Sequence, residues 1–154
     1  MRNTRGAFLW ITGIMRRSGI NFLIVGGFAA KMYGSKRRLA DIDIEIRGRH
    51  IERLRPLVSR YITFGPGRYL DRHWDLRLMT LRYRGQTIDV CDIDNEKIFD
   101  RLSEKWVRME DTLSGKRMTI YGTRALVMPK RALVAYKKRL GRGVDLEDVR
   151  QLTG

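Results

Sequence analysis

The chain has 154 residues, of which 43% are hydrophobic and 32% are charged. This length suits one domain with a substantial core, and the composition excludes a large multidomain assembly and a long disordered chain. The formal net charge of +15 favours a polyanionic partner such as nucleic acid or a nucleotide phosphate, and an acidic partner protein also fits.

The cysteine content and the hydropathy pattern indicate the compartment. Cys91 is a single cysteine, so no internal disulfide can form and no oxidising compartment is required. The longest uncharged stretch, residues 18–30, is too short to span a bilayer, and Arg16-Arg17 stands where a signal peptide would need small residues. We therefore expect a cytoplasmic protein with no membrane partner, in which Cys91 is a packed thiol.

Apolar periodicity in the first half of the chain predicts alternating helices and strands. An apolar run that ends at Gly26-Gly27 is typical of a buried strand, and strict alternation of acidic and β-branched residues predicts a strand with one acidic face. Pro56 would bend or restart the third helix. The expected helices cover 5–18, 28–33 and 51–61, and the expected strands cover 22–25 and 41–46.

The second half predicts a hairpin, a weak helix, two further strands and a helical C-terminal end. Gly65-Pro66-Gly67 is expected to be a turn, and Pro129 suits the first position of a helix. Strands are expected over 74–78, 87–93, 116–121 and 124–127, and helices over 98–106, from 129 to 140 and from Asp145 onward. The fold class is therefore α/β (α+β), with a helical C-terminal end, in a single domain over 1–154.

Asp41 and Asp43 are the most informative polar residues. Residues i and i+2 of a strand point to the same face with Cα atoms about 7 Å apart, so their carboxylates can share a divalent cation such as Mg²⁺. The alternative is a solvated strand face whose acids pair with Arg37, Arg47 or Arg49. The histidines, His50 and His73, have no companions at metal-ligand spacing, so zinc is not expected.

Gly26-Gly27 follows a buried strand and precedes a helix. Glycine allows the backbone to approach a phosphate closely, although the same pair is also typical of a tight turn that binds nothing. The spacing does not match the glycine pattern of dinucleotide-binding folds.

In combination, these residues resemble a known family. Gly26-Gly27, thirteen intervening residues, Asp41-Ile42-Asp43 and a later Asp89 resemble the nucleotidyltransferase superfamily that includes DNA polymerase beta. The similarity is greatest to its small single-domain members, which often occur in toxin–antitoxin or abortive-infection pairs. It covers residues 20–46, 84–93 and 118–152, and it implies a nucleotidyltransferase-like mixed sheet.

The resemblance implies that Asp41, Asp43 and Asp89 hold two Mg²⁺ (or Mn²⁺) ions and that Asp89 helps to deprotonate the attacking hydroxyl. It implies nucleoside triphosphate binding, most simply of ATP, by Gly26, Gly27, Arg37 and Lys137. The alternative for Arg37 and Lys137 is a solvated basic side chain, and Asp145 with Asp148 is expected to form a helix cap and its N3 acid. Phe28 departs from the family pattern, because many members have a phosphate-binding Ser there, and Leu39 and Val144 depart at two other positions.

The function expected from the sequence is transfer of a nucleoside monophosphate to a hydroxyl of RNA, including tRNA, of a protein or of a small molecule, with release of pyrophosphate. The alternative is a catalytically weak or inactive module of the same fold that pairs with a toxin or antitoxin or binds nucleic acid. A small-molecule modifier such as an antibiotic adenylyltransferase is a third reading.

Overall fold

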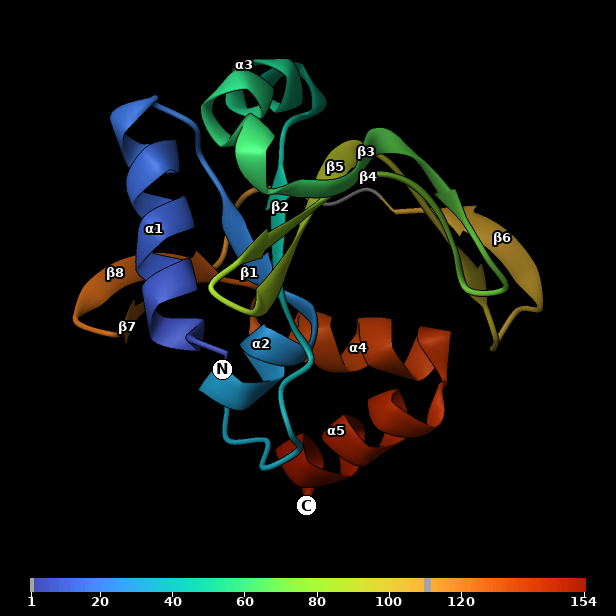
Figure 1. Ribbon diagram of the computed structural model, residues 1–154. Helices are drawn as coiled ribbons and strands as arrows, with labels where there is room; N and C mark the ends of the chain where they lie inside the picture. Colours follow the sequence, from blue (N-terminus) through green and yellow to red (C-terminus); the bar gives the residue numbers. More distant parts are fainter. Residues whose placement is uncertain (1, 110–111) are drawn as a thin grey trace.

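A mixed β-sheet runs through the molecule (Figure 1), and the computed structural model describes residues 2–109 and 112–154. Within these residues the sheet has eight strands in the order β3-β4-β5-β2-β1-β8-β7, with β6 paired to β5. The strands are β1 (Leu23–Val25), β2 (Asp41–Ile46), β3 (Ile62–Leu70), β4 (Trp74–Tyr83), β5 (Gln86–Asp100), β6 (Lys105–Arg108), β7 (Lys116–Ile120) and β8 (Thr123–Val127).

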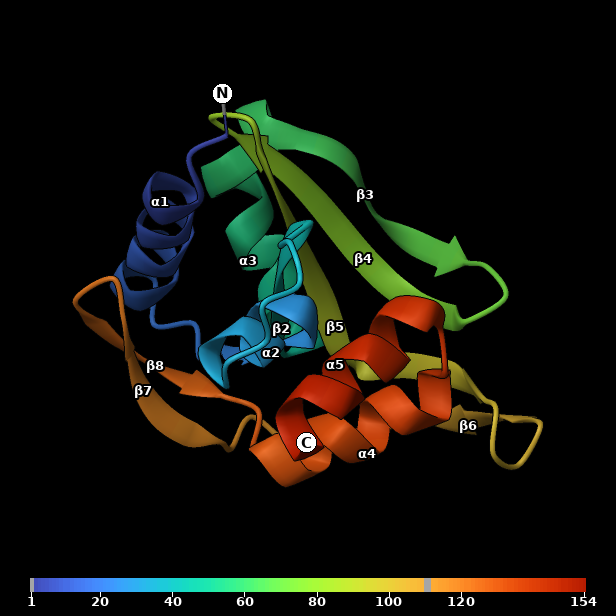
Figure 2. The ribbon, with the colours of Figure 1, turned by 90° about the horizontal axis from the view of Figure 1, so that it is seen from below.

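The helices cover the central strands from different sides. α1 and the adjacent pair α4–α5 lie on different sides of β1 and β2 (Figures 1 and 2). In the described part of the chain, no helix is both long enough and apolar enough to cross a membrane. The helices are α1 (Thr4–Arg17), α2 (Gly26–Met32), α3 (Gly48–Val58), α4 (Lys130–Leu140) and α5 (Gly143–Thr153), and the 3-10 turn η1 covers Ser59–Tyr61.

The centre of the sheet is formed by β2 and β5, which pair in parallel with Ile42 opposite Ile88 and Ile44 opposite Val90. These four side chains are fully buried on one face of the sheet, in the main core. Because successive side chains of a strand alternate between faces, the acidic residues between them point to the opposite face. The alternation predicted from the sequence is confirmed, and it determines which face of the sheet carries the acidic residues.

Phe28 is a core residue. It lies on α2, is 1% exposed, and packs edge-on against Phe8 of α1 with ring centroids 5.4 Å apart. The side chain at this position therefore joins α2 to α1 instead of facing a ligand. This packing is the physical reason that an aromatic residue occupies a position where a phosphate-binding Ser was the family expectation.

The predicted helix over 98–106 is wrong. β5 continues to Asp100, and after a turn β6 pairs back onto it with Phe99 opposite Trp106. Pairing with β4 also extends this far, because Trp74 lies opposite Ile98. Hydrogen bonds to two neighbouring strands thus outweigh a weak local helical pattern, as tertiary contacts commonly do for strands.

Other assignments also differ from the prediction. Gly65-Pro66-Gly67 lies inside edge strand β3 and not in a turn. The pairing of β3 with β4 shifts register between Phe64 and Gly67, and an edge strand tolerates the missing N–H of proline. α3 continues through Pro56 to Val58, and the 3-10 turn η1 follows it directly. α2 begins at Gly26, and the last helix begins at Gly143, each two residues before the predicted start.

The packing of Phe28 generates a stability prediction. Replacing it with Ala leaves a cavity between α1 and α2, and we expect a loss of about 3–5 kcal/mol in the free energy of unfolding, measured by urea denaturation. Leu102→Ala is the control, because Leu102 is 73% exposed, and it should change stability by no more than about 0.5 kcal/mol. Equal effects of the two substitutions would contradict the assignment of Phe28 to the core.

Candidate active site

A cavity of about 690 Å³ lies between the acidic face of the sheet and helices α4 and α5. This volume is in the usual range for sites that bind small molecules. Every site residue predicted from the sequence lines it: Gly26, Gly27, Arg37, Asp41, Asp43, Asp89 and Lys137. The fold therefore brings together residues that are up to 111 positions apart in the chain.

The carboxylates of β2 and β5 form the floor of the cavity. Asp43 lies directly opposite Asp89 in the parallel pairing, and Asp41 lies two residues earlier on the same face. Thr80 of β4 lies opposite Asp89 on its other side and donates a 2.8 Å hydrogen bond from Oγ1 to Asp89 Oδ1. This bond holds one oxygen of Asp89 and leaves the other available to a ligand.

The three acids share a partly desolvated space, and their pKa values are all raised. Burial, followed by the charges of Asp89 and Asp41, raises the pKa of Asp43 to about 8. Burial raises the pKa of Asp89 to about 6 against the opposing hydrogen bond from Thr80, and burial also raises the pKa of Asp41. Mutual repulsion of this kind is relieved when a cation binds among the carboxylates.

The glycine turn is shaped by its contact with Asp43. Gly26 has φ +63°, and a Cβ placed there would lie 2.3 Å from Asp43 Oδ2. The backbone N–H of Gly27 donates a hydrogen bond to the same carboxylate, and a Cβ at Gly27 would lie 2.9 Å from Arg37 Nη2. Side chains at these positions would therefore collide with the residues that line the cavity.

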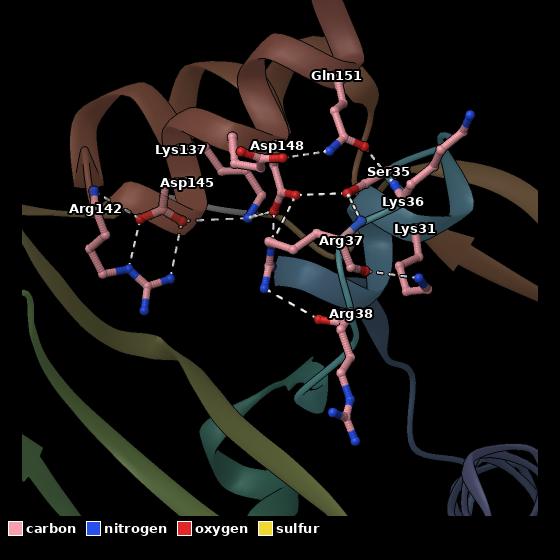
Figure 3. Close-up of polar contacts among 11 residues, drawn as sticks. Lys31, Ser35, Lys36, Arg37, Arg38, Lys137, Arg142, Asp145, Asp148 and Gln151 are labelled. Carbon is pink, nitrogen blue, oxygen red and sulfur yellow. Dashed lines mark hydrogen bonds and ion pairs between the residues drawn. The ribbon is translucent and has the colours of Figure 1, made fainter.

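The opposite wall of the cavity contains a buried ion-pair network (Figure 3). Asp148 of α5 is fully buried and accepts hydrogen bonds from Arg37 Nε at 3.1 Å, Arg37 Nη2 at 3.0 Å and Ser35 Oγ at 2.8 Å. Lys137 Nζ of α4 lies 3.0 Å from Asp148 Oδ2 and 3.5 Å from Asp145 Oδ1. Arg142 Nε donates to Asp145 Oδ2 at 2.7 Å.

This network corrects two readings of the sequence. Lys137 is 2% exposed and Arg37 is held by Asp148, so neither is a freely solvated basic side chain. Asp145 is the N3 acid of α5, but the N-cap is Arg142, and Asp148 lies inside the helix as an ion-pair partner. Three basic groups share two carboxylates here, so one positive charge is left in excess on this wall.

The donor chemistry of the floor fits a divalent metal ion. Oxygen ligands are those that Mg²⁺ and Mn²⁺ prefer, and Asp41, Asp43 and Asp89 supply them on adjacent positions of paired strands. Within residues 2–109 and 112–154, however, no three acidic, histidine or cysteine side chains are grouped closely enough to hold a metal as they stand. Carboxylates that repel one another are expected to be spread apart in this way before a cation binds.

Several lining residues were not identified from the sequence. Glu45 continues the acidic alternation of β2 and could have been read as a site residue on that pattern. Thr80, Trp74 and Glu96 join the cavity only through strand pairing, and Tyr136 only through the docking of α4. No local pattern in the sequence marks these four positions.

Several solved structures have a fold similar to that of this chain. A provisionally assigned nucleotidyltransferase of Thermotoga maritima has a TM-score of 0.70 at 13% identity, over 97% of this chain and 93% of its own. Lincomycin-bound LnuA, a lincosamide antibiotic adenylyltransferase, has a TM-score of 0.63 at 13% identity, over 100% of this chain and 99% of its own. ANT(2'')-Ia in complex with adenylyl-2''-tobramycin has a TM-score of 0.61 at 15% identity, over 96% of this chain and 86% of its own.

Structural similarity at such low sequence identity establishes the fold alone. That fold is nucleotidyltransferase-like, as predicted from the sequence. No protein-family profile matches the chain, and no curated protein matches it in sequence.

The network around Asp148 generates a second stability prediction. Asp148→Asn leaves the buried Lys137 with a weaker set of partners, and we expect a loss of about 3 kcal/mol in the free energy of unfolding. Glu147→Gln on the exposed side of α5 is the matched control and should cost no more than about 0.5 kcal/mol. A near-neutral Asp148→Asn would show that the network does not stabilise the fold.

The same carboxylate predicts a dependence of stability on pH. Burial opposes ionisation of Asp148, but hydrogen bonds from Arg37, Lys137 and Ser35 outweigh it and lower its pKa to about 2. Its pKa is about 4 in the unfolded chain, so its contribution is complete above about pH 4 and is lost as pH falls toward 2. The stability difference between wild type and Asp148→Asn should shrink over that interval, and urea titrations at stepped pH would reveal a constant difference if this is wrong.

Proposed function

We propose that this protein is a Mg²⁺-dependent nucleotidyltransferase that moves a nucleoside monophosphate from a nucleoside triphosphate to an acceptor hydroxyl and releases pyrophosphate. The observation that carries the proposal is the in-register pairing of Asp43 with Asp89 on the floor of a cavity whose opposite wall has an excess positive charge. An acidic floor suits the cation, and a basic wall suits the phosphates.

The reaction forms a bond between the acceptor oxygen and the α-phosphorus, and the bond to the pyrophosphate oxygen breaks. Asp89 is the residue placed to take the proton, because its pKa of about 6 leaves it mostly ionised at neutral pH and Thr80 orients it. Asp41, Asp43 and Asp89 would hold Mg²⁺, or Mn²⁺, which when bound would stabilise the charge on the entering and leaving oxygens. The protein side chains thus position the reactants and accept the proton.

The triphosphate is proposed to bind between the glycine turn and the network of α4 and α5. α2 has only seven residues, so Gly26 and Gly27 supply close backbone approach more than a helix dipole. Arg37 and Lys137 are proposed to compensate most of the negative charge of the triphosphate. Phe28 is buried in the core and makes no contact with the phosphates in this proposal. ATP is the proposed donor, because LnuA is an adenylyltransferase and the ANT(2'')-Ia complex contains an adenylylated product.

The acceptor is proposed to be a small molecule, because the cavity that contains Asp89 also extends along the sheet to Leu76 and Glu96. Lincomycin and adenylyl-tobramycin are small molecules bound by proteins of this fold. The alternative inferred from the sequence, a module that pairs with a toxin or antitoxin or binds nucleic acid without catalysis, predicts binding without turnover.

The test is pyrophosphate release from ATP in the presence of Mg²⁺ and candidate acceptors, including amino sugars, RNA and protein. Asp43→Asn should reduce the rate by at least about 10³-fold, because it removes one of the proposed metal ligands. The variant should fold and be no less stable than wild type, because it removes a buried acid that is repelled by Asp89 and Asp41. Exposed Glu104→Gln is the control and should retain full activity.

A wild-type protein that binds ATP but releases no pyrophosphate with any of these acceptors would favour the non-catalytic alternative. Transfer of label from the α-phosphate of ATP would identify which acceptor class is used.

A further inference from the structure

Beyond the aspartates, the floor of the cavity continues into a second acidic region. Along β4, Thr80 lies opposite Asp89, Leu78 opposite Cys91 and Leu76 opposite Glu96. Glu96 therefore lies about 13 Å from the level of Asp89, at about 3.3 Å per residue. Glu45 of β2 pairs with Cys91 and lies between the two levels. We call Glu45, Glu96, Trp74 and Tyr136 the acidic subsite, and all four line the cavity.

Glu96 is buried without a full set of partners. It is 5% exposed, and its Oε1 accepts a 3.3 Å hydrogen bond from Tyr136 Oη, which in turn accepts one from Trp74 Nε1 at 3.0 Å. Its second oxygen, Oε2, has no hydrogen-bond partner among the described residues. A buried carboxylate oxygen without a donor is costly, so its retention in a cavity wall indicates a ligand that supplies the donor.

The surrounding charge shows which donor fits. Two carboxylates, those of Glu45 and Glu96, line this end of the cavity, and Asp89 lies next along its floor. Arg142 also lines the cavity, and its guanidinium lies 4.4 Å from the centre of the Trp74 ring. Arg142 is already bound by Asp145 through Nε and Nη2, which leaves Glu96 Oε2 to an external group.

We propose that the acceptor carries a protonated amine or guanidinium that binds in the acidic subsite against Glu96, while its hydroxyl reaches Asp89. This inference rests on the proposed function and specifies its substrate class. In the transfer, the hydroxyl proton passes to Asp89, the acceptor oxygen bonds to the α-phosphorus of ATP, and pyrophosphate leaves with the electrons of the broken P–O bond. The cationic group remains unchanged and fixes the orientation of the acceptor.

The net charge of the chain makes the inference specific. At +15, the molecule as a whole repels small cations and attracts nucleic acid. A cation that binds must therefore be attracted by a local group of acids, whereas a polyanionic acceptor would have to enter a negative region of the cavity. RNA as the acceptor is the competing outcome of the test.

The binding experiment uses the full-length protein with spermidine, a flexible polyamine, as the probe. The chain has three tryptophans, and the indole N–H resonance of Trp74 can be assigned by comparison with Trp74→Phe. Spermidine should shift this resonance saturably and leave those of Trp10 and Trp106 unchanged. Triethylene glycol, an uncharged chain of similar length, should leave all three unchanged.

The decisive variant is Glu96→Gln, which should weaken spermidine binding about tenfold or more, because a charge-assisted hydrogen bond is lost. Its melting temperature should equal or exceed that of wild type, because a buried carboxylate with an unsatisfied oxygen is replaced by a neutral amide, so lost binding would not reflect unfolding. Exposed Glu104→Gln is the matched control and should bind spermidine as wild type does. Absence of a Trp74 shift, or equal binding by Glu96→Gln, would overturn the proposal.

The outcome of this experiment can be separated from that of the catalytic test. Saturable, Glu96-dependent binding of spermidine with no pyrophosphate release would retain the cation site and reject the proposed transfer. Transfer of the α-phosphate label to RNA or protein, without spermidine binding, would retain the nucleotidyltransferase and reject the cationic acceptor.

Discussion

The parallel pairing of β2 with β5 is the constraint on which the candidate site depends. It places Asp43 beside Asp89 and at the same time places Ile42 and Ile44 in the core. A shift of one residue in this register would exchange the two faces, so it would bury carboxylates and expose isoleucines. The hydrophobic effect that holds the sheet together therefore also holds the acids in position, and the site needs no separate scaffold.

The acids that this register gathers are in an unfavourable environment when no ligand is bound. Burial and mutual repulsion raise their pKa values, and Asp43 lies so close to the glycine turn that a Cβ at Gly26 would clash with it. Sites that carry this kind of local cost are typical of proteins in which stability has been exchanged for function. On the facing wall the opposite holds, because Asp148 is fully buried and well satisfied by Arg37, Lys137 and Ser35.

Charge is distributed differently outside and inside the molecule. The net charge of +15 describes the chain as a whole, and it bears on solubility and long-range association more than on the chemistry of one site. The cavity has an acidic floor that extends from Asp41 to Glu96 and a basic wall at Arg37 and Lys137. A nucleoside triphosphate at the basic wall together with a cationic acceptor at the acidic end matches this arrangement better than a polyanionic acceptor does.

The sequence determined the elements whose signals are local. Alternation in residues 41–46 marked the acidic face of β2, the apolar run before Gly26-Gly27 marked β1, and the spacing of these residues from Asp89 indicated the family resemblance. Each of these signals depends on side-chain periodicity or on glycine, which act over a few residues. The same local reasoning failed for β3 and for the end of β5, where pairing with distant strands decided the conformation.

Only the tertiary structure decided which side chains share the cavity. That Thr80 holds Asp89, that Asp148 binds both Arg37 and Lys137, and that Glu96 lies beside Tyr136 are contacts between residues 9 to 111 positions apart. Strand register and helix docking set these contacts, and both depend on the packing of the whole core. No short stretch of sequence carries that information, so the acids of the site could be named in advance but not their partners.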